Sequence, residues 1–545
     1  MSFLNNAKSN LRITVLFGGR LLTANKLFYA AAHSLKDISH CFFKTEILLG
    51  IFIAGYGFSS HAEDTEASTP FTHNIVIELA RDLADKPYEA PQAAPETLTD
   101  LDYSTYRQIN FQQNSAVWGD TPTPFSVQLF APGFLYEHLV DIDVVENGKS
   151  FPVDINEESF RVPQPGLAAT LAEVGKYAGM RLHFPINRSD YSDEFVLFQG
   201  ASYFRAVSRG QSYGLSARGL AIDVAGQNGE EFPLFKRFWI ERPGKDQNAI
   251  VVHALLDSQS LAGAYRFGIY PGAPTYMEVK ATLFPRRDLE HVGLAPLTSM
   301  FMHDTLVPPK TPDYRPAVHD SGALKIKLSN GEQVWRPLNN PDTLQMSVFR
   351  DQNPKGFGLI QRQRDFEDYQ DLEARYERRP SAWVKPLNNW GAGAVQLIEI
   401  PSEAESNDNI VAYWRPAETL IQGQPYEFSY LLSWPNDVPP SNDLARVVRS
   451  SSGIKLFTTD QEMVIDFTGL DPEQLDTLDI GATTSQGRIL ETRIQANPAV
   501  DGARVFVSFD PEGADMTELR VQLTRDSRPV AETWLFRWIA ESWIP

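Results

Sequence analysis

Short runs of β-forming residues, separated by proline, glycine and asparagine, make up most of the chain from Tyr106 onward. Few stretches show the 3.6-residue apolar repeat of a helix, and the crossover helices that a parallel sheet requires are missing from the pattern. The chain also contains 37 prolines, which interrupt helices and punctuate strands. The pattern therefore predicts an all-β fold, with a large antiparallel β-sandwich as its main part.

Individual elements follow from the same periodicities. Two helices are expected, at 74–84, where apolar residues recur at helical spacing, and at 167–178, after a Pro-Gly pair. Strands are expected at 126–130, 140–145, 194–198, 203–207, 249–256, 265–269, 276–284, 324–328, 394–400 and 410–414.

A domain boundary is predicted at 434–443, WPNDVPPSND, where Pro, Asn and Asp cluster without an apolar repeat. Residues 63–433 would form the large sandwich and 434–443 a linker. The residues at 444–545 alternate apolar and polar side chains again over a length typical of an immunoglobulin-like β-sandwich. No cysteine pair of the antibody type is present there, because the only cysteine of the chain is Cys41.

The first 62 residues have the character of an export signal. They are basic, and 47–57 is an apolar core of signal-peptide length, with small residues before a cleavage site after Ala62. A membrane anchor is the alternative, but the apolar run is shorter than the roughly 20 residues that span a bilayer. No twin-arginine pair is present, so we expect Sec-type export to the periplasm.

Charge and motifs exclude several classes of function. The chain carries a formal charge of −20, and the remainder without the basic first 62 residues stands at −24, so no nucleic acid partner is expected. No phosphate-binding loop or serine nucleophile elbow is present. The histidines lack the spacing of a helical zinc site, so no metal and no cofactor are predicted.

The chemistry is expected in the segment 362–416, where acids, arginines and aromatic residues are dense. Residues 365–379 lack a helical repeat and are predicted to form a loop. The two strands at 394–400 and 410–414 are joined by a turn that holds Glu403, Glu405 and Asp408. Carboxylates on so short a turn repel one another, and a cleft can use that repulsion to raise the pKa of one of them.

Aromatic side chains in the same region suggest a carbohydrate cleft. A sugar ring has an apolar face that packs on an aromatic ring and hydroxyls that need polar partners. Core packing is the alternative for any single tryptophan. The candidate binding residues are Trp335, Trp383, Trp390, Trp414 and Arg364.

Several long and uncommon runs identify a resemblance. They are 200–223 (GASYFRAVSRGQSYGLSARGLAID), 230–243 (EEFPLFKRFWIERP), 293–301 (GLAPLTSMF), 314–321 (YRPAVHDS), 335–341 (WRPLNNP), 353–366 (NPKGFGLIQRQRDF), 375–384 (RYERRPSAWV) and 406–414 (SNDNIVAYW). In this order they resemble the periplasmic glucan biosynthesis proteins G and D (OpgG and OpgD, or MdoG). The absence of twin arginines favours the G type.

The resemblance implies a galactose mutarotase-like β-sandwich followed by an immunoglobulin-like domain, in a periplasmic protein that acts on β-1,2-glucan. Some members are inverting endo-β-1,2-glucanases, and relatives perform transglycosylation. The resemblance also implies a functional link to an inner-membrane glucan synthase, and homodimers in some relatives.

By the same resemblance, Asp408 corresponds to the general acid and Asp320 to the general base, which acts on water through a proton relay. Glu405 and Tyr376 match supporting positions. In inverting glycosidases the two carboxyl groups stand roughly 6.5–9.5 Å apart, or farther where water bridges them. A non-catalytic glucan-binding factor that assists a synthase remains the alternative of a different class, and an aldose epimerase ranks below both.

Overall fold

The computed structural model describes residues 14–17, 20–23, 69–227, 229–440 and 444–540. The predicted signal cleavage site lies outside the described residues. Within the predicted signal segment, only the paired strands β1 (Thr14–Phe17) and β2 (Arg20–Thr23) are described. Strand makes up 48% of the described residues and helix 10%, so the all-β prediction is confirmed.

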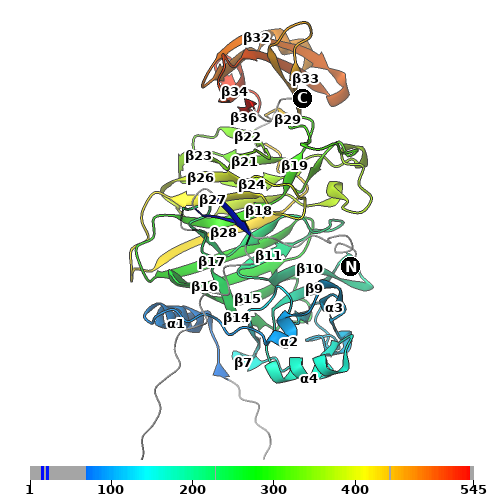
Figure 1. Cartoon of the computed structure of the whole chain (residues 1–545), viewed down its shortest axis with the longest axis vertical. Coiled ribbons are helices and arrows are strands. Elements are labelled where there is room, and N and C mark those ends of the chain that lie inside the picture. The colour runs from blue at the N-terminus through cyan, green and yellow to red at the C-terminus, as the bar shows by residue number, and fades with distance from the viewer. Residues whose placement is uncertain (1–13, 18–19, 24–68, 228, 441–443, 541–545) are drawn as a thin grey trace, which may run out of the picture.

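Two large sheets dominate the molecule (Figure 1). In order across the first, ten-stranded sheet, the strands are β23 (Gln345–Gln352), β26 (Ala392–Glu399), β27 (Ile410–Pro416), β18 (Val292–Ser299), β12 (Ser216–Arg218), β11 (Tyr203–Ala206), β10 (Tyr191–Gln199), β9 (Gly179–Arg188) and β5 (Ser126–Phe130), with β13 (Leu220–Ile222) beside β18. In order across the second, sixteen-stranded sheet, the strands are β3 (Thr69–Pro70), β7 (Lys149–Pro152), β6 (Asp141–Glu146), β14 (Leu234–Glu241), β15 (Ile250–Asp257), β16 (Leu261–Tyr270), β17 (Thr275–Pro285), β28 (Tyr426–Trp434), β25 (Ala382–Pro386), β24 (Gly356–Ile360), β21 (Ala323–Lys327), β22 (Gln333–Pro337), β36 (Thr533–Ile539), β34 (Met516–Arg525) and β31 (Asp479–Thr484), with β35 (Arg528–Pro529) beside β34.

The main core fills the space between these sheets with aromatic rings. Phe198 of the first sheet meets Phe267 of the second edge to face, with ring centroids 5.2 Å apart. Trp414 of the first sheet lies 6.4 Å from Trp390, which in turn packs edge to face on Phe428 of the second. Such pairs bury large apolar areas, and their preferred edge-to-face geometry helps to fix how the two sheets face each other.

The C-terminal residues form a second, smaller sandwich at one end of the molecule (Figure 1). One of its layers is a separate four-stranded sheet of β29 (Arg446–Ile454), β30 (Gln461–Thr468), β33 (Gly502–Asp510) and β32 (Arg488–Asn497). The other layer is continuous with the large sheet, because β36 pairs in parallel with β22 through Trp534 and Trp335. The predicted boundary at 434 falls at the end of β28, whose final residue Trp434 is fully buried.

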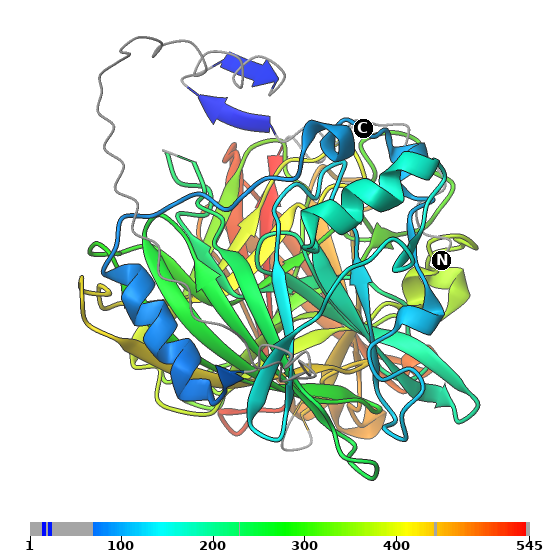
Figure 2. The ribbon, with the colours of Figure 1, turned by 90° about the horizontal axis from the view of Figure 1, so that it is seen from below.

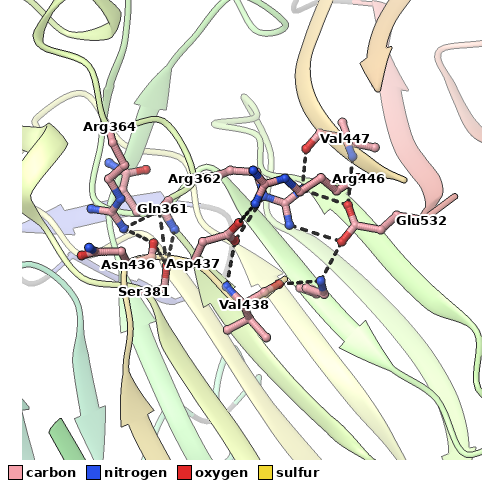
Figure 3. A network of polar contacts seen from close by, with 11 residues as sticks. Gln361, Arg362, Arg364, Ser381, Asn436, Asp437, Val438, Arg446, Val447 and Glu532 are labelled. Carbon is pink, nitrogen blue, oxygen red and sulfur yellow. Dashed lines mark hydrogen bonds and ion pairs between the residues drawn. The ribbon is translucent and has the colours of Figure 1, made fainter. Parts of the chain in front are cut away.

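A buried ionic network joins the small sandwich to the large one (Figure 3). Glu532, just before β36, is fully buried and binds Nζ of Lys325 at 2.7 Å and the guanidinium of Arg362 at 2.8 Å. Its carboxylate also accepts a hydrogen bond from the backbone nitrogen of Val447 at 3.0 Å. Arg362 reaches Asp437 of the predicted linker as well, at 3.2 Å. Lys325 also donates to the carbonyl oxygen of Val438. The two buried cations therefore fix residues 437 and 438 of the predicted linker.

Removing the charge of Glu532 should weaken the whole molecule. Burial alone would raise the pKa of Glu532, but Arg362 and Lys325 outweigh burial and the pKa lies below its usual range. The substitution Glu532→Gln would leave the buried Lys325 without a counter-charge and Arg362 with only Asp437, which costs about 3–5 kcal/mol of unfolding free energy. Urea unfolding would measure this.

The matched control is Glu518→Gln, since Glu518 binds Arg537 at 2.6 Å but its side chain is 42% exposed. A surface pair contributes at most about 1 kcal/mol, so this variant should stay close to the parent. Equal midpoints for the two variants would contradict the role given to Glu532.

The α-helices lie at the opposite end from the small sandwich (Figure 1) and are seen from below in Figure 2. The two predicted helices are confirmed near their predicted positions. The first, α1 (His73–Ala84), packs on β15, β16 and β17. The fourth, α4 (Pro165–Val174), stops short of the predicted end because Gly175 adopts a left-handed conformation, φ 62°, that terminates it. The short helices are α2 (Glu96–Thr99) and α3 (Tyr103–Tyr106).

A pair of histidines fastens α1 to the sheet. Nδ1 of His73 lies 3.0 Å from Nδ1 of His253 in β15, and Nε2 of His253 lies 2.7 Å from Oε1 of Glu241 in β14. Burial, together with His253 and Arg266, lowers the pKa of His73 to about 4.

Acid should therefore loosen α1. An unfolded histidine titrates near pH 6.5, so between about pH 6.5 and 4 the unfolded chain binds a proton that folded His73 does not, and stability falls through that window. His73→Gln should flatten this part of the stability curve, which thermal unfolding across pH 4 to 7 would show. Parallel curves for the two proteins would refute the assignment.

Candidate active site: a polar cleft beside two aspartates

The turn that carries Asp408 is held at both ends by asparagine side chains. At its start, Asn340 Nδ2 donates to Ser402 O at 2.9 Å, and Ser402 N donates back to Asn340 Oδ1 at 2.9 Å. At its end, Asn409 Nδ2 donates to Phe301 O at 2.9 Å, and Phe301 N donates to Asn409 Oδ1 at 2.8 Å. Each side-chain amide thus makes the pair of backbone hydrogen bonds that a neighbouring strand would otherwise make. Both asparagines are buried.

Asp320 reaches the same place from a different loop. It follows β20 (Val318–His319), which pairs with β19 (Phe301–His303), and its backbone nitrogen donates to Met300 O at 2.9 Å. Phe301 therefore has His319 on one side and Asn409 on the other. This shared strand brings the two aspartates together although 88 positions separate them in sequence.

The two carboxylates differ in their surroundings. Asp320 is buried and ion-paired with Arg379, whereas the Asp408 side chain is 34% exposed and lies 3.9 Å from Nη2 of Arg205. Burial raises the pKa of Asp320 and the charge of Asp408 raises it further, while Arg379 acts in the opposite direction. Asp320 therefore lies close enough to Asp408 for the charge of Asp408 to act on its pKa.

The predicted loop at 365–379 is confirmed and contains only the short 3₁₀ turns η3 (Phe366–Asp368) and η4 (Tyr376–Arg378). The guanidinium of Arg379 lies 4.3 Å from the centroid of the Tyr376 ring. The hydroxyl of Tyr376 donates to Glu405 Oε2 at 3.3 Å. Gln361 ties the start of the loop to the Asp320 strand by donating to His319 O at 2.8 Å.

Arg315 connects three segments around the site. Its Nη1 binds Asp371 of the loop at 2.8 Å and Glu405 of the turn at 2.8 Å, while its Nη2 binds Asp313 at 2.8 Å. The hydrogen bonds to Asp313 are the largest cause that raises the pKa of Arg315, so this cation stays charged at any working pH.

These segments enclose a polar cleft of about 850 Å³. Its walls come from 302–318, 371–379 and 402–406, and Glu405, Tyr376 and Arg379 lie on them. Asp320 contacts the wall residue Arg379, and Asp408 follows the 402–406 wall by two residues. Acidic side chains outnumber basic ones in the lining, which suits an uncharged ligand better than an anionic one.

The predicted aromatic platform is wrong for three of its four tryptophans. Trp335, Trp390 and Trp414 are buried in the main core, and Trp414 has no exposed surface. Trp335 packs under Arg362 of the interdomain network, 3.6 Å from ring to guanidinium. Trp383 is half-buried and packs against Gly356, where a Cβ would lie 2.5 Å from its ring. Among the described residues, no tryptophan lines the cleft.

Arg364 is also not placed to bind a ligand. Its guanidinium donates to the backbone carbonyls of Gln361, Glu377, Arg379 and Asn436, so it closes the base of the 365–379 loop (Figure 3). Burial lowers its pKa, as expected for a cation bound only to carbonyl groups.

The expected repulsion among the acids of the turn is relieved, because Glu405 binds Arg315 and Asp408 faces Arg205. Sequence reasoning missed both of these arginines and Asn409. All three residues lie within runs that carry the family resemblance. The sequence therefore marked these positions but did not indicate which residues they contact.

In the described part of the chain, no group of His, Cys, Asp and Glu side chains could hold a metal ion. Over the same residues, no helix has the length and apolar character to cross a bilayer.

Fold and site together define an all-β protein with two sandwiches, in which an exposed aspartate acts electrostatically on a buried one beside a polar cleft. The chain belongs to the family described as "Periplasmic glucan biosynthesis protein, MdoG", whose profile matches residues 71–538.

Named relatives agree with this membership. "Glucans biosynthesis protein G 2" of Shewanella oneidensis is 58% identical, over 91% of this chain and 93% of the relative. "Glucans biosynthesis protein G" of Vibrio cholerae is 47% identical, over 86% of this chain and 87% of the relative. The protein of the same name from Rhodopseudomonas palustris is 46% identical, over 88% of this chain and 95% of the relative.

Removing Arg315 should open the cleft. Arg315→Ala would leave Asp313, Asp371 and Glu405 facing one another without a cation, and hydrogen bonds to charged groups contribute about 1.5–3 kcal/mol each. We expect a destabilisation of about 2 kcal/mol in urea unfolding and faster proteolytic cleavage within 365–379.

The control is Arg488→Ala, because Arg488 binds Asp510 and Glu512 at the surface of the small sandwich with 63% of its side chain exposed. It should leave the proteolysis of 365–379 unchanged. A loop that is cut no faster in Arg315→Ala than in this control would show that Arg315 does not hold it.

Proposed function

We propose that this protein works in periplasmic glucan biosynthesis and cleaves the β-1,2-glucan backbone internally with inversion. Membership of the family and the names of the relatives support the biosynthetic role. The observation that carries the proposal is the pairing of an exposed Asp408 with a buried Asp320 beside the cleft. Inverting glycosidases need two carboxyl groups of this kind in unlike environments.

In this mechanism Asp408 is the general acid. Its partly exposed position at the end of the turn lets it reach the oxygen of a glycosidic bond, which it protonates as the bond breaks. The Asn340 and Asn409 contacts keep the turn from shifting, so that the carboxyl group meets the bond in one orientation.

Asp320 is the general base and is ionised through its pairing with Arg379. Because it is buried, the proton of the attacking water reaches it through an intervening water or hydroxyl group. Tyr376 and Glu405 line the cleft beside Arg379 and orient that path.

A binding or assembly factor for a membrane glucan synthase is the second candidate. One observation favours it: a buried aspartate paired with an arginine is also what a purely structural ion pair looks like. A transglycosylase that uses the same two carboxyl groups would move glucan chains to a sugar acceptor instead of water.

Under each of these functions the chain acts in the periplasm. We propose that the chain is exported by a Sec-type signal with cleavage after Ala62. We also propose that it forms a homodimer and contacts the membrane glucan synthase.

Asp408→Asn should abolish cleavage. The mature chain, 63–545, would be incubated with linear β-1,2-glucan while chain length and the anomeric form of the first product are followed. General acid catalysis contributes about 10²–10⁴-fold, so loss of the proton should slow cleavage by at least that factor. Asp320→Asn should do the same.

The acidic limb of the rate profile gives an independent check. Since burial raises the pKa of Asp320, the base is ionised only above the usual aspartate value of about 3.9, and activity should fall below a correspondingly higher pH. Glucan that binds but is never shortened would refute the hydrolase and leave the binding factor. Longer products would identify a transglycosylase.

A further inference from the structure

An aromatic ring on the outer face of the ten-stranded sheet has no role in the site described above. Phe232 is 47% exposed and directly follows the bridge between Ile222 and Glu231. A single exposed apolar side chain is common on a protein surface, so Phe232 is distinguished only by the residues around it.

The ring is held from behind by a buried cation. The guanidinium of Arg218 lies 5.7 Å from the centroid of Phe232 and 4.8 Å from that of Tyr203. Arg218 is itself fixed, since its Nε donates to Thr298 Oγ1 at 2.7 Å and its Nη1 is paired with Glu230. The buried side of Phe232 thus faces a cation that is held in place, and its other side faces solvent.

The same sheet face leads from Phe232 to Asp408. Tyr203 pairs with Arg218 across β11 and β12, and Arg205 stands two residues along β11, about 7 Å away, on the same face. Arg205 donates to Ser216 Oγ at 2.6 Å and reaches Asp408 at 3.9 Å. The exposed ring, Arg205 and Asp408 therefore lie on the same face of the sheet, and the buried Arg218 connects the ring to Tyr203 beneath it.

Electrostatics agrees with this proximity. Burial raises the pKa of Tyr203 to about 12, and the charge of Asp408 contributes to that rise. Asp408 thus lies between two features. The cleft lined by Glu405 and Tyr376 is on one side, and Arg205, followed by Phe232, is on the other.

We propose that Phe232, backed by Arg218, is a stacking subsite for a glucosyl ring of a glucan whose chain runs from the cleft past Asp408. The inference rests on the proposed function and deepens it, because it makes the site longer than the cleft. An uncharged pyranose fits the surface, since its apolar face packs on the ring and its hydroxyls accept hydrogen bonds from arginine. The alternative explanation is that Phe232 shields the Arg218–Glu230 ion pair from water. It is weaker, because about half of the Phe232 side chain remains exposed.

The test compares binding across chain lengths. In the mature chain with Asp408→Asn, which prevents cleavage during the titration, β-1,2-linked glucan oligomers from a trisaccharide upward are titrated by calorimetry. Phe232→Ala should weaken the Kd of long oligomers by about three- to tenfold and leave the trisaccharide unchanged, because only long chains reach the ring. Phe232→Trp should restore the affinity.

Tyr270→Ala is the matched control, because Tyr270 is 45% exposed and lies in β16 of the other sheet. It should bind every oligomer as the parent does. Equal affinities of Phe232→Ala and the parent at all lengths, or an equal loss at all lengths, would overturn the subsite. Absence of binding to any oligomer by the Asp408→Asn parent, and by the chain with Asp408 intact, would overturn the proposed function and this inference with it.

Discussion

The buried carboxylate of Glu532 is the interaction on which the arrangement of the molecule depends. It neutralises Lys325 of the large sandwich and Arg362 at the start of the 365–379 loop, and it accepts from Val447 at the start of the small sandwich. That loop ends at Arg379, which is paired with Asp320. A charge brought in by the C-terminal sandwich therefore bears on the position of an aspartate beside the cleft. This makes the small sandwich a part of the site's framework as well as a neighbouring unit.

The site depends on side-chain amides that form hydrogen bonds in the way a backbone peptide group does. Asn340 and Asn409 each exchange two hydrogen bonds with a neighbouring segment, as one strand does with the next. A turn fixed in this way can present Asp408 at the surface without being part of a sheet itself. Buried amides that satisfy both their donor and their acceptor are rigid, and rigidity is what a reacting carboxyl group requires of its support.

Arginines set the electrostatic character of the cleft. Arg315 faces Asp313, Asp371 and Glu405, while Arg379 faces Asp320 and Arg205 faces Asp408. Each carboxylate thus has an arginine partner, which lies in another segment for all but Asp313, and the acidic chain can gather several acids in one place without driving them apart. The remaining excess of negative charge favours a neutral polymer, in agreement with the proposed glucan.

The sequence by itself determined the all-β architecture, most of the strand positions, the loop at 365–379 and membership of the family, because alternation, turn residues and rare motifs are local properties. It also singled out Asp408 and Asp320 by resemblance. Only the tertiary structure decided that Trp335, Trp390 and Trp414 are core residues and that Arg364 closes a loop, because an aromatic or basic residue has the same local pattern in a core as in a cleft. The roles of Arg315, Asn409 and Glu532 were likewise invisible in the sequence. Each depends on partners that lie far along the chain, and only folding brings those partners within hydrogen-bonding distance.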